Sequence, residues 1–263
     1  MRKTILALLP ILAVPLLAQT PPAQPQIGGG TCTSATLTGS YSLTLSGRDA
    51  SSTGTLLSGV AVGVGTATFD GLSKVAFTLT ENSVKSLGVA ANWSGNYSLQ
   101  ANCVGTISIT SGDSATFTLA SYDQGVSYVI VGEDGTYAYS GGGNNLPTTC
   151  SASLLSGTYS FNGNGFALAS SAISGVTDFS GLMQFDGTSV VTTNWFISSG
   201  GTITPVTTSG SYTVTSGCTG TATMTDPSGK SYALQFTITN STGTFVIGGS
   251  TPLMVFTGSG RTL

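Results

Sequence analysis

The sequence predicts an all-β protein built from two tandem antiparallel β-barrels of about eight strands each. Three observations support this fold class: the composition, apolar residues that recur at every second position, and an internal repeat. Charged residues make up 6% of the 263 residues, where soluble domains average about 25%, and there are 37 glycines. Because long exposed helices depend on charged helix-forming residues, this composition favours short strands and turns.

The composition also excludes several classes of function. Seven Lys and Arg face ten Asp and Glu, so the chain has no surplus of positive charge for a nucleic-acid surface. Histidine is absent, which removes the Ser-His-Asp triad, the Cys-His pair and every His-ligated metal site. We therefore expect no nucleic-acid partner, no metal and no cofactor, and we assign no catalytic residue.

The first 18 residues have the pattern of a secretory signal peptide. Arg2 and Lys3 precede an apolar run from Ile5 to Leu17, which is shorter than the roughly 20 residues that a membrane-spanning helix needs. Residues 19–31 are rich in Pro and Gly and are expected to form a flexible tether. No later run is long enough to span a membrane as a helix, so we expect a secreted protein, located outside the cell, at its surface or in a periplasm.

The folded part is expected to consist of two copies of one unit. Three motifs occur twice, in the same order and at nearly constant separations of 118, 116 and 115 residues. The pairs are Leu37–Leu43 with Leu155–Phe161, Phe69–Gly71 with Phe185–Gly187, and Gly95–Thr106 with Gly210–Thr221. The Gly- and Asn-rich stretch Gly141–Pro147 is typical of a linker. We expect units at 32–143 and 150–263, joined at 144–149, each large enough to bury its own core.

Within each unit, apolar residues alternate with small or polar residues, mostly Ser and Thr. This pattern is typical of antiparallel strands with one face in a core and the other in water. The clearest stretches are Leu37–Ser46, Val75–Thr80, Ile107–Thr110 and Tyr232–Thr239. Asp-Gly at 70–71, 134–135 and 186–187 and Asp-Pro-Ser-Gly at 226–229 are typical of tight turns between strands. Their spacing predicts seven or eight strands per unit.

Four cysteines in an exported chain predict disulfide bonds. Three pairings are possible, and a duplicated unit favours pairing within each copy, since each copy must fold alone. The expected bonds are therefore Cys32 with Cys103 and Cys150 with Cys218, and free buried thiols are the alternative.

The separations of the paired cysteines, 71 and 68 residues, also suit an immunoglobulin-like sandwich. That fold expects a tryptophan on the third strand and a tyrosine two residues before the second cysteine. Here Trp93 and Trp195 come late in each unit, and Tyr97 and Tyr212 lie six residues before the cysteine. Closed barrels are therefore favoured, and two β-sandwiches are the alternative.

Two paired motifs of the units resemble a repeat of small exported bacterial β-proteins without assigned function, and the second copy is the closer match. They are Leu-x-Gly-x-Tyr-x-Phe at 155–161 and Gly-x-Tyr-x-Val-x-x-x-Cys-x-Gly-Thr-x-Thr at 210–223. The first copy departs from the second at Val104, where the second has Thr219. The resemblance implies export, a disulfide and a barrel similar to those of calycins or allene oxide cyclase. Because the motif residues are mainly glycines and aromatics, it implies no catalytic residue.

The aromatic residues that recur in the two units are the candidates for contact with a ligand. An eight-stranded barrel holds either packed side chains or one small ligand, so these residues are expected to form the core or to line an apolar cavity. They are Tyr41, Trp93, Tyr97, Tyr159, Trp195 and Tyr212. The recurring Asp70 and Asp186 stand beside glycine, where such residues stabilise turns.

Together these observations predict an exported, disulfide-stabilised tandem β-domain protein that acts as a structural, surface or binding module rather than as an enzyme. The alternative is a carrier of a small apolar ligand inside a calycin-like barrel. An enzyme would have to work with Asp, Glu, Tyr or backbone dipoles alone. An outer-membrane barrel is disfavoured by internal disulfides and by too few aromatic residues for two girdles. The partners that fit are a small apolar ligand or a component of the cell surface.

Overall fold

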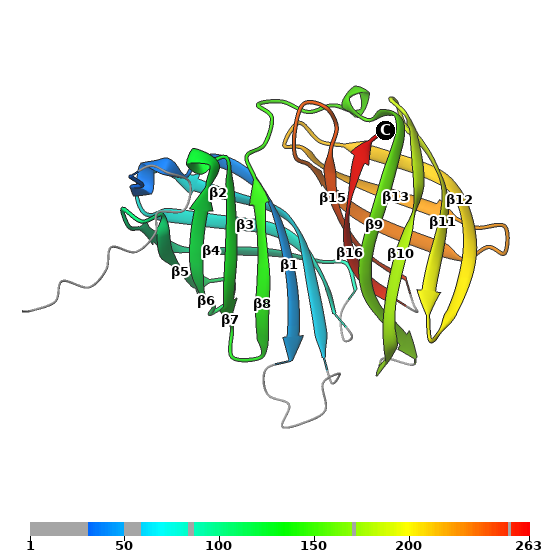
Figure 1. Cartoon of the computed structure of the whole chain (residues 1–263), viewed down its shortest axis with the longest axis horizontal. Coiled ribbons are helices and arrows are strands. Elements are labelled where there is room, and N and C mark those ends of the chain that lie inside the picture. The colour runs from blue at the N-terminus through cyan, green and yellow to red at the C-terminus, as the bar shows by residue number, and fades with distance from the viewer. Residues whose placement is uncertain (1–30, 50–58, 84–86, 170–171, 252–253) are drawn as a thin grey trace, which may run out of the picture.

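The computed structural model describes residues 31–49, 59–83, 87–169, 172–251 and 254–263. These residues form two closed barrels of eight antiparallel strands each (Figure 1). In both barrels every strand pairs with its neighbours in the chain, and the last strand pairs with the first. The all-β class and the two barrels are thereby confirmed. The expected signal peptide and the tether up to residue 30 lie outside the described residues.

Barrel 1 contains β1–β8 and barrel 2 contains β9–β16. The strands of barrel 1 are β1 (Thr38–Asp49), β2 (Val60–Asp70), β3 (Lys74–Ser83), β4 (Val89–Leu99), β5 (Val104–Ser111), β6 (Thr116–Tyr122), β7 (Ser127–Glu133) and β8 (Tyr137–Asn144). Those of barrel 2 are β9 (Ser156–Ala169), β10 (Ala172–Asp186), β11 (Val190–Ser199), β12 (Thr202–Val214), β13 (Thr219–Thr225), β14 (Ser231–Ile238), β15 (Phe245–Thr251) and β16 (Met254–Thr262).

Helical structure in the described ranges is limited to three single turns of 3-10 helix. They are η1 (Ser34–Thr36), η2 (Asp123–Gly125) and η3 (Ala152–Leu154). None of the helices described is long and apolar enough to cross a membrane.

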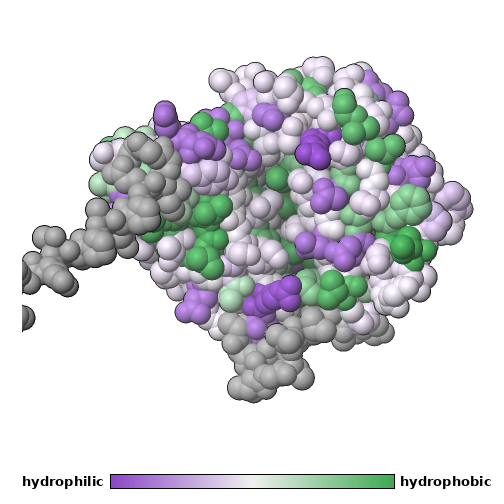
Figure 2. All heavy atoms as spheres, viewed as in Figure 1, coloured by the Kyte–Doolittle hydropathy of each residue, from purple (hydrophilic) through white to green (hydrophobic). Residues whose placement is uncertain are grey.

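The two-residue period places one face of each strand inside its barrel. In β1, Tyr41, Leu43 and Leu45 point inward and are at most 2% exposed. The buried apolar residues form one large cluster in each barrel. The outward positions carry mainly Thr, Ser and Asn. Accordingly the face seen in Figure 2 is mostly of intermediate hydropathy, with scattered hydrophilic and hydrophobic residues.

The glycines at 141–143 belong to β8, within the first unit, although the composition of Gly141–Pro147 is typical of a linker. β8 closes barrel 1 against β1, and the two backbones come very close there. A Cβ atom at Gly141 would collide with the carbonyl oxygen of Thr44, and one at Gly143 with that of Ser42. A glycine run therefore serves here as a strand that permits close approach, although its composition is also typical of a linker.

The two barrels lie side by side, and the outer face of β2 packs against β14, β15 and β16 (Figure 1). Val60, Val62 and Val64 point out of barrel 1 and are nevertheless at most 3% exposed. Val62 packs with Leu168 and Val255 of barrel 2 in a small cluster of its own. The outward valines of β2 therefore form a core between the barrels.

Shape and hydrogen bonds fix the relative position of the barrels. Val64 lies so close to Gly248 that a Cβ atom at position 248 would collide with its methyl group. Beside this contact, the hydroxyl of Thr237 donates a buried hydrogen bond to the carbonyl oxygen of Gly65 at 2.9 Å. Two further contacts cross the interface: Asn82 Nδ2 donates to Gln235 Oε1 at 3.4 Å, and the Arg48 guanidinium lies 5.2 Å from the ring of Phe166.

Candidate functional site

One end of each barrel is closed by a disulfide bond and a 3-10 turn. The bonds Cys32–Cys103 and Cys150–Cys218 are both formed, and no described cysteine is free. The predicted pairing within each unit is therefore confirmed, and it is consistent with an oxidising environment.

The same tyrosine ties the 3-10 turn to the barrel in both copies. Tyr97 donates from its hydroxyl to the carbonyl oxygens of Ser34 at 2.7 Å and Leu37 at 3.0 Å. Tyr212 donates to the two matching carbonyls of barrel 2, those of Ala152 and Leu155, both at 3.3 Å. These bonds satisfy the buried hydroxyl and close the barrel end, which is a structural role.

All six aromatic residues that we considered as ligand-lining lie inside the barrels and are at most 4% exposed. In barrel 1, Tyr41 and Tyr97 pack edge to face on Phe69, with ring centroids 5.5 and 4.9 Å apart. In barrel 2, Tyr159 and Tyr212 pack on Phe185 in the same way, at 5.6 and 4.8 Å. Their ring neighbours are other aromatic side chains. A role in lining a ligand remains a prediction for them.

Trp93 and Trp195 do not occupy matching positions, although both lie in the middle of a unit. Trp93, on β4, faces Phe77 across the strand pair. The repeated motifs align Phe69 with Phe185 and Gly95 with Gly210. In this alignment the positions of Phe77 and Trp93 are taken in barrel 2 by Thr193 and Thr208, which also face each other across a strand pair. Their hydroxyls lie 2.6 Å apart inside the barrel. Barrel 2 therefore has a polar pair where barrel 1 has two large rings.

Burial raises the pKa of the barrel tyrosines. For Tyr97, Tyr212 and Tyr232 the pKa rises to about 12 from 10.0, chiefly because the charged phenolate would lose its hydration. Nearby carboxylates add to the effect: Asp70, Asp186 and Asp226 respectively. These hydroxyls are therefore poor acids at neutral pH.

We expect the protein to lose stability as the pH rises above 10. The unfolded chain releases phenolic protons near pH 10, whereas the folded barrels hold those of Tyr97, Tyr212 and Tyr232 up to about pH 12. This stabilisation is complete below pH 10 and is lost as the pH approaches 12. Urea midpoints measured from neutral pH to pH 12, together with phenolate absorbance, test this. Tyr212→Phe keeps the ring without the titrating group, so its midpoint should decline less; equal declines would contradict the assignment.

The recurring acidic residues form turns. Asp70 Oδ1 accepts hydrogen bonds from the backbone N–H groups of Leu72, Ser73 and Lys74 at 2.8–2.9 Å, and Asp186 repeats this arrangement in barrel 2. At Asp186 the hydroxyl of Thr188 also donates to Oδ2, at 2.6 Å. The hydrogen bonds hold the pKa of both carboxyls below its ordinary value, chiefly through the N–H of Lys74 at Asp70 and the hydroxyl of Thr188 at Asp186. Within the described ranges no three His, Cys, Asp or Glu residues are grouped to hold a metal ion.

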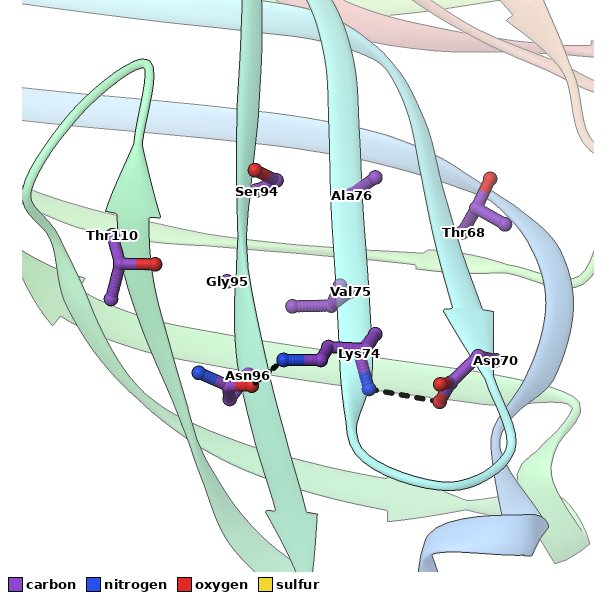
Figure 3. Close-up of a pocket in the computed structure, with 9 residues that line it drawn as sticks. All are labelled: Thr68, Asp70, Lys74, Val75, Ala76, Ser94, Gly95, Asn96 and Thr110. Atoms are coloured by element: carbon purple, nitrogen blue, oxygen red, sulfur yellow. Dashed lines mark hydrogen bonds between the residues drawn. The ribbon is translucent and has the colours of Figure 1, made fainter.

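A hollow of about 360 Å³ lies on the outer wall of barrel 1, beside the Asp70 turn (Figure 3). Lys74 crosses it and donates from its ammonium group to Asn96 Oδ1 at 2.7 Å. The matching residues of barrel 2 are Val190 and Ser211, so this polar pair exists in one copy alone. A single exposed ammonium bound to an amide can form surface hydrogen bonds, but the hollow contains no activated nucleophile or base.

A second hollow, of about 210 Å³, lies where the barrels meet. Its walls come from β2–β4 of barrel 1 and β12–β14 of barrel 2, and they carry no charged side chain. The polar groups are threonine hydroxyls from both barrels and the amides of Asn92 and Gln235. This groove is suited to neutral hydrogen-bonding contacts.

A third hollow, of about 460 Å³, opens into the wall of barrel 2. Ile197 and Val206 supply apolar surface, Tyr232 lies at its inner side, and Asp226 and Lys230 stand on the adjoining β13–β14 turn. The sequence predicted a turn at Asp226 and a strand beginning at Tyr232, but no site there. One sequence difference could have pointed to this site: barrel 1 has Phe77 and Trp93 where barrel 2 has Thr193 and Thr208. This difference becomes visible only when the strands of the two barrels are aligned by their pairing.

Comparison with protein-family models and with curated proteins finds no match.

Proposed function

We propose that the protein is an exported structural or surface-binding module that acts through its shape and neutral surface as a rigid pair of barrels. Its support is an outer face that is rich in hydroxyl groups and carries few charges, the packed aromatic interiors and a disulfide in each barrel. The observation that carries the proposal is the buried contact of Val64 with Gly248, secured by the hydrogen bond from Thr237 to Gly65. Such a contact holds the two barrels at one orientation.

The differences between the copies limit the module to two barrels. Val131 of barrel 1 matches Gly248 of barrel 2. Its side chain would block a valine that docked there as Val64 docks on Gly248. In barrel 2 the positions of Val62 and Val64 are held by Asp178 and Ser180. A further barrel docked in the same way would bury an unpaired carboxylate. We infer that the chain forms a discrete pair and does not add copies end to end through this face.

Export agrees with the two disulfides, which persist in oxidising compartments, and with the signal pattern of residues 1–18. The resemblance of the repeat motifs is the only support for a bacterial source and for a calycin-like carrier role. Of the two roles, the carrier has one observation in its favour, the hollow in the wall of barrel 2.

Gly248→Val tests the rigid pair. The added side chain collides with Val64, so we expect the barrels to separate while each stays folded, with a loss of about 1–3 kcal/mol of stability. In ¹⁵N relaxation, both barrels of the wild type should tumble with one correlation time, and those of the variant with shorter, separate ones. Gly175→Val is the matched control, because an added Cβ there meets no atom within 4 Å. Separate tumbling in the wild type would contradict the proposal.

A further inference from the structure

The wall of barrel 2 is interrupted beside β12. This strand pairs with β11 along most of its length, but with β13 only from Ser209 onward. The segment Thr202–Thr208 therefore has no ladder partner toward β13 among the described residues. The gap between this segment and the Asp226–Lys230 turn is the hollow lined by Ile197, Val206 and Tyr232.

In barrel 1 the matching segment of β4, Val89–Trp93, also has no ladder partner toward β5 among the described residues, but a large ring packs there. Trp93 is 3% exposed, and its ring centroid lies 6.3 Å from that of Phe77 and 6.2 Å from that of Tyr139. The chain at Gly112 also passes so close to Asn92 that a Cβ atom would collide with its carbonyl oxygen. Barrel 2 has Thr208 at the position of Trp93. Thr208 is itself 1% exposed, and no ring of comparable size stands at its place.

Trp195 lies behind the hollow and has an unused hydrogen-bond donor. It faces Val206 across the strand pair, and its ring centroid lies 5.6 Å from that of Tyr232; both of these residues line the hollow. Trp195 is 2% exposed, and its Nε1 has no hydrogen-bond partner within the described part of the chain. A buried N–H without an acceptor is unfavourable, so an acceptor atom brought by a ligand would be stabilised there.

We propose that this hollow binds a small uncharged molecule with an apolar body and one oxygen acceptor, and that Trp195 Nε1 donates a hydrogen bond to that oxygen. Ile197 and Val206 provide the apolar contact. The rim carries one carboxylate and one ammonium, Asp226 and Lys230, so its charges cancel and favour a neutral ligand. The site lies within barrel 2 and does not depend on the rigid pair. Its failure would therefore leave the proposed function standing.

A matched pair of probes tests the proposal on the full disulfide-bonded chain. Acetophenone has an aromatic ring and a carbonyl oxygen, whereas ethylbenzene has a similar shape without the acceptor. We expect acetophenone to bind about tenfold more tightly, the effect of one hydrogen bond to a buried donor. In ¹H–¹⁵N spectra it should shift the indole N–H signal of Trp195 and leave that of Trp93 unchanged. Equal affinities, or an unmoved Trp195 signal, would overturn the proposal.

Variants locate the site. Val206→Trp fills the hollow from inside and Thr204→Trp fills it from its exposed rim, so each should weaken acetophenone binding at least tenfold in calorimetry. Thr204 is exposed, so its replacement does not disturb the core and keeps the test valid if Val206→Trp fails to fold. Ser209→Trp, on the exposed outer face of the same strand, is the matched control and should bind as the wild type does. Wild-type binding by Thr204→Trp would exclude this hollow as the site.

Discussion

Replacing Cys150 and Cys218 together by Ser should lower the unfolding free energy of barrel 2 by about 4 kcal/mol. The bond joins residues 68 apart in the chain, so its loss gives the unfolded state a large gain in conformational freedom. Urea unfolding without reductant, with hydrogen exchange resolved by barrel, measures this loss. The effect is large because a domain of this size typically has only about 5–15 kcal/mol of net stability.

The other barrel provides the control for this prediction. Cys32 and Cys103 are 71 residues apart, so their double replacement by Ser should destabilise barrel 1 by nearly the same amount. Reduction of the wild type should reproduce both losses at once. A loss below about 1 kcal/mol in either barrel would show that its closed end is held by packing alone.

Phe185→Ala should destabilise barrel 2 by about 3–5 kcal/mol. Phe185 is 2% exposed and lies at the centre of an aromatic cluster, with ring centroids 4.8–6.2 Å from those of its neighbours. These neighbours are Tyr159, Tyr212, Phe236 and Phe245. Truncation leaves a cavity that the neighbouring rings can fill only in part, because hydrogen bonds hold the hydroxyls of Tyr159 and Tyr212 in place. Chemical unfolding at neutral pH measures the change.

Phe196→Ala makes the same chemical change on the outside of the barrel. Phe196 is 52% exposed on β11, so its truncation should cost less than about 1 kcal/mol. Phe69→Ala, at the matching position of barrel 1, should behave like Phe185→Ala. If the buried and the exposed variants lost equal stability, the packed aromatic interior could not be the main stabilising element.

The two copies retain what holds a barrel together and differ where contacts are made. The disulfide, the Asp-Gly turn and the tyrosine that ties the 3-10 turn occur in both. The differences lie at the interface valines of β2, at Lys74 with Asn96, and at Thr193 with Thr208. The residues that both copies share are those that each barrel needs in order to fold. We therefore expect functional contacts at the positions where the two copies differ.

Much of the fold was predictable because its signals are local. The alternation in β1 and β14, the turns at Asp70 and Asp186, and the repeated motifs each depend on residues close together in the chain, and all are confirmed. The stretch Gly141–Pro147 has a composition typical of a linker, yet its glycines at 141–143 are part of β8, because glycine occurs both in linkers and in strands whose backbones approach closely. Which of the two applied depended on β1, about 100 residues away.

The sequence by itself predicted two tandem units, barrels of about eight strands in preference to sandwiches, and a disulfide within each unit, since the two-residue period, the turns and the duplicated motifs are all local signals; the structure confirms each of these. Only the tertiary structure decided which side of barrel 2 receives the valines of β2, and that the buried indole N–H of Trp195 has no hydrogen-bond partner among the described residues. The physical reason is that packing between sheets and hydrogen-bond satisfaction depend on residues brought together across the fold. A periodic pattern specifies that a side chain is buried, but it does not specify its neighbours.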